Sequence, residues 1–235
     1  MQKRLLDIVF SLSVLTILSL PLLLVAIVLR LTGERKVFFY QKRIGYRRAV
    51  FEVTKFVTMV TDAEVLGSRD ITLADDPRVL PFGRFLRKTK LNEMPQFWDI
   101  LVGKMTLVGW RPLLPDSFND YSLEIQERLI ESKPGLTGIG SLVFRDEEEL
   151  LGMAAEKGRD MRVFYREEIL PYKGAIEVWY IENSCLHLDC KILIATVIAV
   201  LAPNSPGYLT WFKDLPRPTS ELIRKHLGTQ EETPN

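Results

Sequence analysis

The feature that most constrains this chain is an uncharged apolar segment of 22 residues near its N-terminus, from Ile8 to Leu29. A helix of about 20 apolar residues is long enough to cross the hydrocarbon core of a bilayer. Pro21 lies inside the segment, where it removes a backbone donor and bends a helix, and Ser19 is placed to satisfy a freed carbonyl group. We therefore expect a bent helix in contact with a membrane.

The charges around this segment indicate how it lies. Basic residues flank it on both sides: Lys3 and Arg4, then Arg30, Arg35 and Lys36. Because basic residues favour the cytoplasmic side of a membrane, both ends are assigned to the cytoplasm, and residues 1–36 are predicted to form a re-entrant helix in one leaflet. A helix that spans the bilayer and tolerates its proline is the alternative. A cleavable signal peptide fits less well, since the segment is too long and no small-x-small site follows it.

The rest of the composition narrows the chemistry. The chain has 235 residues, of which 47% are hydrophobic, so one soluble domain plus a membrane element is expected. Cys185 and Cys190 lack the spacing of a zinc site or a redox pair and are interpreted as reduced packing residues. With only His187 and His226, a histidine-rich metal site is excluded and a Ser-His-Asp triad is disfavoured. Catalysis then has to depend on carboxylates and cations, and no nucleic-acid partner is expected.

A second feature is a cluster of cations that leads into an acidic residue. Five basic residues and no acidic ones lie between positions 78 and 90, although the net charge of the chain is only +1: Arg78, Arg84, Arg87, Lys88 and Lys90. The local electrostatic potential is therefore positive where that of the chain is nearly neutral. Such a segment, followed by Glu93, is typical of phosphate chemistry.

One hairpin is predicted in a chain that otherwise looks helical. Residues 37–41 and 50–56 are rich in aromatic and β-branched side chains and flank a turn-like Gly45–Arg48, so they are expected to pair. Asn92 is a plausible N-cap for a helix over residues 93–101, with Pro95 tolerated in its first turn.

Further helices are expected along the C-terminal half. Asp116 or Ser117 is predicted to begin a helix that ends at Lys133, and the acids of residues 146–149 open another. The apolar residues 192–202 are too few to span a bilayer and are expected to form a helix that is buried or lies in the membrane interface.

The expected fold class is α+β. A re-entrant membrane helix over residues 1–36 precedes a mostly helical cytoplasmic domain with a small hairpin or sheet over residues 37–228. The polar tail, residues 229–235, is expected to be disordered.

Three stretches carry a resemblance to a known family. The chain reads L-R-K-T-K-L-N-E-M-P-Q from Leu86, G-K-M-T-L-V-G-W-R-P from Gly103 and P-G-L-T-G from Pro134. It resembles the bacterial sugar transferase family, the monotopic phosphoglycosyl transferases, whose core usually reads L-R-K-x-x-L-D-E-L-P-Q, then G-D-M-S-L-V-G-P-R-P, then P-G-[IL]-T-G. The resemblance covers most of the chain from Lys3 to Arg145.

The resemblance implies a reaction, a cofactor and a location. Members transfer a sugar-1-phosphate from a UDP-sugar to polyprenol (undecaprenyl) phosphate with Mg²⁺ and release UMP, which initiates a surface polysaccharide or glycoconjugate. They act at the cytoplasmic face of the inner membrane. Their re-entrant helix is broken at a Ser-Pro pair, and here the corresponding residues are Ser19 and Pro21.

The resemblance also implies roles for particular residues. Glu93 matches the second member of the catalytic Asp-Glu pair and is a tentative Mg²⁺ ligand, while Arg87 matches an active-site arginine. Arg111 matches the Pro-Arg-Pro motif, which meets the nucleotide diphosphate, and Trp110 replaces its first proline, so its indole could stack on the uracil. Lys55 matches a Lys-Phe-Arg motif, in which Val57 replaces the arginine. Asp75, Asp76 and Arg78 match an Asp-Asp-Pro-Arg stretch, which is either a solvated loop or a substrate-facing one. The cations Lys55, Arg78, Arg84 and Lys88 are expected to bind substrate phosphate.

The chain departs from the family at the nucleophile. The position of the nucleophilic aspartate is occupied by Asn92, and a carboxamide is a poor nucleophile. Losing a nucleophile typically lowers a rate by roughly 10⁴ to 10⁶. Three explanations stay open: another carboxylate such as Glu93 attacks, the mechanism differs, or catalysis is lost. The alternative function is accordingly a catalytically silent homologue that binds lipid phosphate or a partner transferase, and a third is a peripheral anchor for anionic lipid headgroups.

Overall fold

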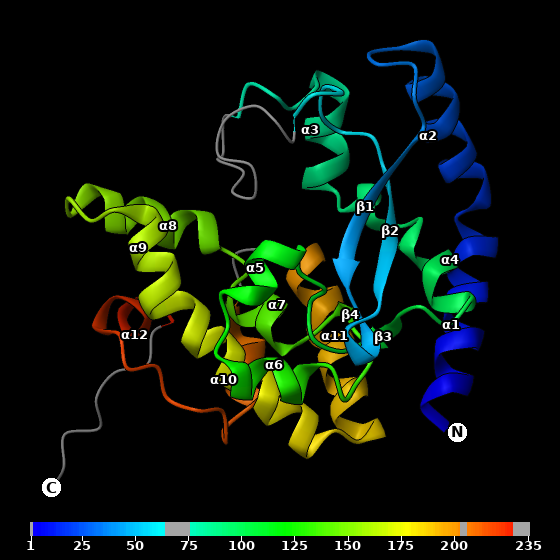
Figure 1. The fold of residues 1–235 in the computed structure, drawn as a ribbon. Coiled ribbons are helices and arrows are strands. Elements are labelled where there is room, and N and C mark those ends of the chain that lie inside the picture. The colour runs from blue at the N-terminus through cyan, green and yellow to red at the C-terminus, as the bar shows by residue number, and fades with distance from the viewer. Residues whose placement is uncertain (1, 64–75, 203–205, 228–235) are drawn as a thin grey trace, which may run out of the picture. The chain divides into compact units, whose positions relative to one another are not determined.

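The computed structural model describes residues 2–63, 76–202 and 206–227, and these form two compact units (Figure 1). The first contains Met1–Val108, Pro112–Pro115 and Lys133–Leu136. The second contains Gly109–Arg111, Asp116–Ser132 and Thr137–Asn235. Helices predominate in both, with two small two-stranded sheets among the described residues, so the predicted α+β class is confirmed.

The N-terminal apolar segment forms two helices, as its proline predicted. Helix α1 (Gln2–Ile17) and helix α2 (Ser19–Leu31) meet at Leu18 with a bend of 63°. The bend lies before Pro21, which sits in the first turn of α2, where a missing N–H is tolerated. Ser19 Oγ donates to Thr16 O at 2.8 Å across the break. Among the described helices none is long and apolar enough alone to cross a membrane, although this bent pair has the length and composition for it.

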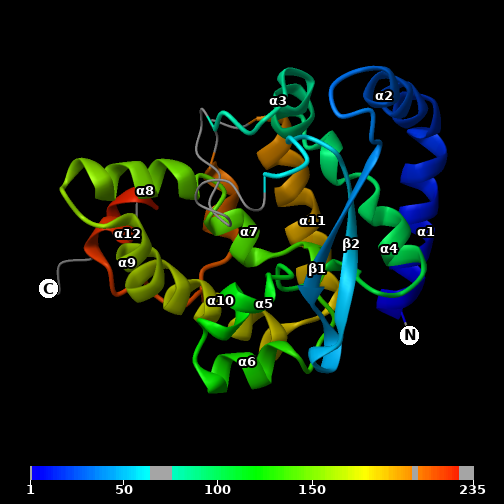
Figure 2. The same ribbon diagram turned by 45° about the horizontal axis from the view of Figure 1, so that its top comes forward.

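Two polar contacts attach α1 to the first unit. Asp7 is buried on α1 and accepts hydrogen bonds from Thr106 Oγ1 at 2.9 Å and from Leu107 N at 2.8 Å in strand β3 (Thr106–Val108). Arg4 donates to the carbonyl oxygens of Ile100 and Leu101, both at 2.6 Å, at the C-terminal end of helix α4 (Gln96–Leu101). A cation suits the negative end of a helix dipole. Helices α1 and α4 consequently lie side by side (Figures 1 and 2).

The predicted hairpin is present. Strand β1 (Phe38–Ile44) pairs antiparallel with β2 (Val50–Phe56), and the 3₁₀ turn η1 (Tyr46–Arg48) joins them. The first strand extends three residues beyond the predicted 37–41, because Lys42 and Arg43 pair with Glu52 and Phe51.

Helices α2 and α3 (Pro81–Lys88) pack with the hairpin. Val25 and Leu29 of α2, Phe56 of β2 and Leu86 of α3 form one buried apolar cluster. A Cβ atom on Gly83 would lie 2.2 Å from Thr58 O, so α3 approaches the chain after β2 closely only because this residue has no side chain. Strand β3 pairs with β4 (Gly135–Thr137) in the second small sheet.

The second unit is helical around a buried apolar core. Its helices are α5 (Pro115–Asn119), α6 (Leu123–Leu129), α7 (Ile139–Val143), α8 (Glu147–Glu156), α9 (Met161–Phe164), the π-turn η3 (Tyr165–Ile169), α10 (Leu170–Asn183), α11 (Leu186–Leu201), the 3₁₀ helix η4 (Pro206–Trp211) and α12 (Glu221–His226). Helices α6 and α7 pack on α10, and α12 packs on α8 (Figure 2). The core contains Ile139, Leu150, Phe164, Ile169, Ile176 and Ile192.

The helix expected from Asp116 or Ser117 to Lys133 is wrong in its extent. Two short helices, α5 and α6, replace it, because Ser122 adopts an extended conformation and its side chain caps α6 through Ile125 N. The helix expected from residues 146–149 is confirmed as α8. The apolar residues 192–202 form the end of α11, with one face buried and another exposed. The expected disordered tail, residues 229–235, lies outside the described residues.

The Asp7 contact predicts that α1 contributes to the stability of the whole first unit. Asp7→Ala leaves two buried donors without an acceptor, so we expect a loss of about 2–4 kcal/mol in the free energy of unfolding. Thermal unfolding of the purified protein in detergent measures it. Ser13→Ala on the same helix is the control, since Ser13 is exposed and bonds only to Val9 of its own helix. Equal melting temperatures for the two variants would contradict this prediction.

Candidate functional site

The segment that resembles the catalytic core folds as a short irregular connection. After α3, Lys90 adopts a left-handed conformation with φ 58°, and Leu91–Glu93 forms the 3₁₀ turn η2 before α4 begins at Gln96. The prediction that Asn92 caps a helix over residues 93–101 is therefore wrong, because Pro95 occupies the cap position of α4. Asn92 is instead buried, and its Oδ1 accepts no hydrogen bond from the described residues.

Glu93 lies opposite Lys55. The Nζ of Lys55 on β2 lies 3.5 Å from Glu93 Oε1, and the two side chains are 18% and 17% exposed. The pair is therefore shielded from bulk water and still reachable by a ligand. The two opposite charges attract each other at this distance and help to hold the two side chains in place.

Asp99 holds the strand that carries Lys55. Its side chain is completely buried on α4 and accepts from Thr54 N at 2.8 Å and Thr54 Oγ1 at 3.2 Å. Lys104 Nζ lies 3.6 Å from the same carboxylate. The edge of β2 away from β1 is thus attached to α4 directly beside Lys55. We missed Asp99 from the sequence, although a single acid within Phe97–Leu101 was a signal of a buried polar contact.

The cations of α3 differ in their surroundings. Arg84 and Lys88 are exposed, and Arg87 is half-buried. The charge of Arg87 helps to lower the pKa of Asp76, after the larger effect of the hydrogen bond from Arg78. The structure therefore places Arg87 near this carboxylate, and the roles predicted for the three cations stay predictions.

Arg78 is engaged within its own loop. It is buried and donates to both oxygens of Asp76, through Nε at 2.9 Å and through a terminal nitrogen at 2.6 Å, and another nitrogen donates to Ala63 O at 2.9 Å. This bidentate pair raises the pKa of Arg78 and lowers that of Asp76. Asp75, predicted to belong to the same stretch, lies outside the described residues.

Arg111 belongs to the second unit. Its backbone N–H donates to Glu177 Oε1 at 3.4 Å. The neighbouring Trp110 is 1% exposed, packs against the Phe118 ring at a tilt of 42° and donates through Nε1 to Ser132 O at 3.1 Å. The expected stacking of this indole on a uracil is therefore wrong, because its ring is part of the protein core.

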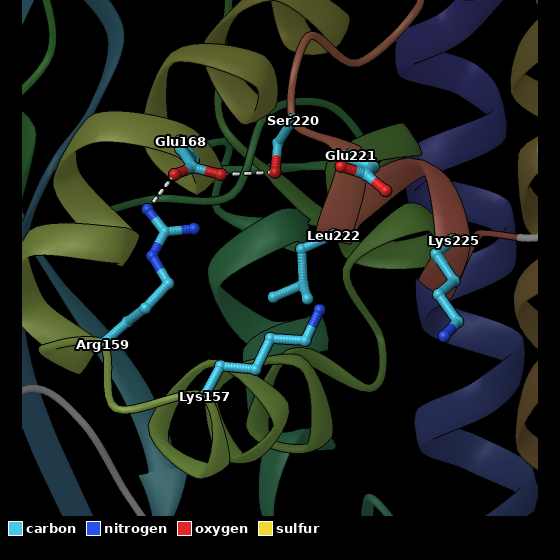
Figure 3. A pocket seen from close by; sticks show the side chains of 7 residues that line it. All are labelled: Lys157, Arg159, Glu168, Ser220, Glu221, Leu222 and Lys225. Atoms are coloured by element: carbon cyan, nitrogen blue, oxygen red, sulfur yellow. Dashed lines mark hydrogen bonds and ion pairs between the residues drawn. The ribbon is translucent and has the colours of Figure 1, made fainter.

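A pocket in the second unit contains none of the predicted site residues (Figure 3). Glu168 joins two of its sides, since it accepts hydrogen bonds from Arg159 and from Ser220, the N-cap of α12. The remaining lining residues are Lys157, Glu221, Leu222 and Lys225. These contacts attach α12 to the π-turn η3 before α10.

The first unit offers few ligands for a metal ion. Over the described ranges there is no cluster of three or more His, Cys, Asp or Glu residues. Mg²⁺ usually keeps several waters and is bound by one or two carboxylates together with substrate phosphates. The Glu93 carboxylate and the orphaned Oδ1 of Asn92 fit that pattern, in which the donor diphosphate completes the set.

A buried carboxamide and a shielded carboxylate-lysine pair thus lie on an α+β scaffold, at the segment that carries the family motif. The family model for bacterial sugar transferases matches residues 1–203. The chain therefore belongs to the bacterial sugar transferase family, as its motifs predicted.

Individual relatives agree with this assignment. The uncharacterized sugar transferase EpsL of Bacillus subtilis is 35% identical over 199 residues, which are 85% of this chain and 87% of EpsL. The undecaprenyl-phosphate galactose phosphotransferase of Salmonella typhimurium is 30% identical, and the undecaprenyl-phosphate glucose phosphotransferase of Komagataeibacter xylinus is 35% identical. The matches cover 85% and 84% of this chain but only 40% and 35% of those two longer relatives.

Removal of Asp99 is predicted to loosen the site. Asp99→Ala leaves the two donors of the half-buried Thr54 without this acceptor, so we expect a loss of about 2 kcal/mol in stability, whereas Asp99→Asn keeps an acceptor and loses about 1 kcal/mol. Thermal unfolding measures both against Asp62→Ala, which removes an exposed carboxylate and should change stability by less than about 0.5 kcal/mol. Equal stability of Asp99→Ala and Asp62→Ala would show that Asp99 does not hold β2 against α4.

Proposed function

We propose that this chain transfers a sugar-1-phosphate from a UDP-sugar to undecaprenyl phosphate or a similar polyprenol phosphate. The observation that carries the proposal is Glu93, held opposite Lys55 at the segment that matches the catalytic core. Two relatives whose names specify undecaprenyl-phosphate phosphotransferases support the acceptor. The donor diphosphate and the lipid phosphate are both anions, and cations on α3 and β2 reduce the repulsion between them.

Glu93 is proposed to supply the carboxylate that Asn92 lacks. One oxygen of Glu93 attacks the β-phosphorus of the donor, the bond from this phosphorus to the bridging oxygen breaks, and UMP leaves with the electron pair. An oxygen of the lipid phosphate then attacks the same phosphorus, and the bond to Glu93 breaks, which regenerates the carboxylate. Two steps on one phosphorus avoid bringing both anionic substrates together at once.

Mg²⁺ is proposed as the cofactor. Asn92 Oδ1 and Glu93 would hold it together with the donor diphosphate, since hard oxygen ligands suit this ion. The ion would neutralise charge on the diphosphate when bound. Lys55 would balance the charge of Glu93, and Arg87 is proposed to bind a phosphate oxygen.

The bent pair α1 and α2 is proposed to be a re-entrant membrane anchor at the cytoplasmic face of the inner membrane. Large apolar side chains on both helices are exposed to an extent that soluble monomers rarely show: Leu5, Leu12, Ile17, Leu20, Leu23, Leu24 and Leu31. The buried Asp7 and Arg4 contacts attach this apolar surface to the unit that contains Glu93. A site anchored in this way meets its lipid acceptor at the membrane surface.

Transfer of label to lipid tests the reaction. A panel of UDP-sugars labelled with ³²P in the β-phosphate is incubated with polyprenol phosphate, and label in the organic phase is counted. We expect Glu93→Gln to lower the rate by at least about 10³, because the nucleophile is lost, and chelation of Mg²⁺ with EDTA to abolish transfer. Glu52→Gln, an exposed carboxylate on β2, is the matched control and should keep the wild-type rate.

Asn92→Asp separates the explanations for the unusual residue. Under the proposal the wild type is active and Glu93 becomes labelled when the acceptor is omitted. Activity found only in Asn92→Asp would mean that the natural chain is a silent homologue.

Cysteine labelling tests the topology. Gln2→Cys and Lys36→Cys are made separately in a chain carrying Cys185→Ser and Cys190→Ala, where serine preserves a side-chain cap on Leu188 N. A re-entrant helix places both new thiols on the cytoplasmic side, so an impermeant maleimide should modify both in inside-out vesicles and neither in intact cells. Modification of one thiol from each side would show a spanning helix.

A further inference from the structure

Glu177 is a buried acid that neither the motifs nor the proposed reaction uses. It lies on α10 in the second unit with only 2% of its surface exposed. Its Oε1 accepts the N–H of Arg111, and its Oε2 is buried without a hydrogen-bond partner among the described residues. A buried polar atom without a partner is unfavourable, so its presence calls for an explanation.

Two glycines lie against this carboxyl group, where a side chain would not fit. A Cβ atom on Gly140 would lie 2.3 Å from Glu177 Oε1 and 2.9 Å from its Cδ. A Cβ atom on Gly138 would lie 2.1 Å from Gly109 O. Gly109 N also donates to Thr137 O at 2.9 Å. The Gly109–Arg111 and Thr137–Gly140 segments therefore pack backbone to backbone, with Glu177 directly behind them.

The charges around Glu177 come from several elements. Lys173, one turn earlier on α10, is buried and lies 2.5 Å from Glu147 of α8. The charges of Arg111 and Lys173 favour the ionised form of Glu177. Tyr121, just before α6, lies close enough for the charge of Glu177 to raise its own pKa. Tyr165 of η3 lies near Lys173.

We propose that Glu177 is a positioning residue for Arg111: its carboxyl group fills the space left by Gly140, accepts the Arg111 N–H, and so sets the direction in which the guanidinium leaves the backbone toward a nucleotide diphosphate. This inference deepens the proposed function and depends on it for the identity of the ligand. Arg111 is the residue that would touch the diphosphate, and Glu177 acts through it.

The protonation of Glu177 suits this role. Burial raises its pKa to about 8, against the opposing effects of the Arg111 N–H and of the Lys173 and Arg111 charges. The group is then neutral near pH 7 and holds the Arg111 backbone without a net charge of its own. When it ionises, the carboxylate attracts the Arg111 guanidinium inward and away from a ligand.

The pH dependence of nucleotide binding tests the proposal. The dissociation constant of UDP is measured by titration calorimetry on the full chain at pH 7 and pH 9. We expect the dissociation constant to rise about tenfold in the wild type, because the neutral fraction of a group with a pKa of about 8 falls by about that factor and ionised Glu177 competes for Arg111. In Glu177→Gln it should change less than about twofold. Glu182→Gln, which removes an exposed carboxylate from the same helix, should behave as the wild type.

Displacement of the carboxyl group provides a second variant. Gly140→Ala pushes Glu177 away from Arg111, so UDP should bind about tenfold more weakly at pH 7, with a larger effect on the KM of the donor than on kcat. Gly152→Ala, at a position with open space on α8, is the control and should bind normally. The proposal would be overturned if Glu177→Gln lost as much affinity for UDP between pH 7 and pH 9 as the wild type does. Normal UDP binding by Gly140→Ala would also overturn it.

Stability supplies a readout that does not involve a substrate. Because burial raises the pKa of Glu177, the folded state holds the proton of this group more tightly than the unfolded state does. The resulting contribution to stability is complete below the ordinary pKa of 4.5 and is lost as the pH rises to about 8. The wild type should therefore lose stability relative to Glu177→Gln between these values.

If UDP binds as predicted while no sugar phosphate is transferred, the proposed function fails and the positioning role stands.

Discussion

The first unit depends on how strand β2 is held along both of its edges. Strand β1 pairs with one edge, and the buried Asp99 carboxylate binds the other through Thr54. Alternation along a strand then leaves Lys55 directed away from its neighbours and toward Glu93. A lysine side chain has many rotamers, so a fixed backbone is needed to keep its ammonium group at 3.5 Å from a particular carboxylate. Asp7 and Arg4 connect the apolar helices to the same unit, so the proposed membrane anchor and the proposed phosphate site share one scaffold.

The buried acid of the second unit, Glu177, differs from Asp99 of the first unit in its hydrogen bonds. Asp99 is satisfied by three donors, whereas Glu177 has an oxygen without a partner and sits against glycines that leave room for it. The first arrangement is suited to a charged group that fixes geometry permanently. The second is suited to a neutral group whose ionisation changes what Arg111 does. Each acid is proposed to position a cation of its own unit, Lys55 in the first and Arg111 in the second.

The local features of this fold were predictable, and the tertiary ones were not. Aromatic and β-branched residues around Gly45–Arg48 predicted the hairpin, and Pro21 predicted the bend, although the break lies at Leu18. The expectation for Asn92 failed, because the left-handed Lys90 and the cap position of Pro95 are set by packing rather than by the propensity of asparagine. The pairing of Arg78 with Asp76, two residues away, was also not predicted from the sequence, and the substrate role of Arg78 stays a prediction. Glu177 gave only a weak signal, a single acid among the apolar residues 175–181, and its relation to Gly140 exists only in three dimensions.

The central claim is that a member of this family with asparagine at the nucleophile position still moves a phosphosugar, with Glu93 as its carboxylate. The nucleotide product tests this most directly, because breaking the diphosphate releases UMP whereas breaking the sugar-phosphate bond releases UDP. Wild-type protein with a UDP-sugar and polyprenol phosphate should release UMP in equal amount to the sugar that becomes lipid-linked. Release of UDP, or of no nucleotide at all, would contradict the account.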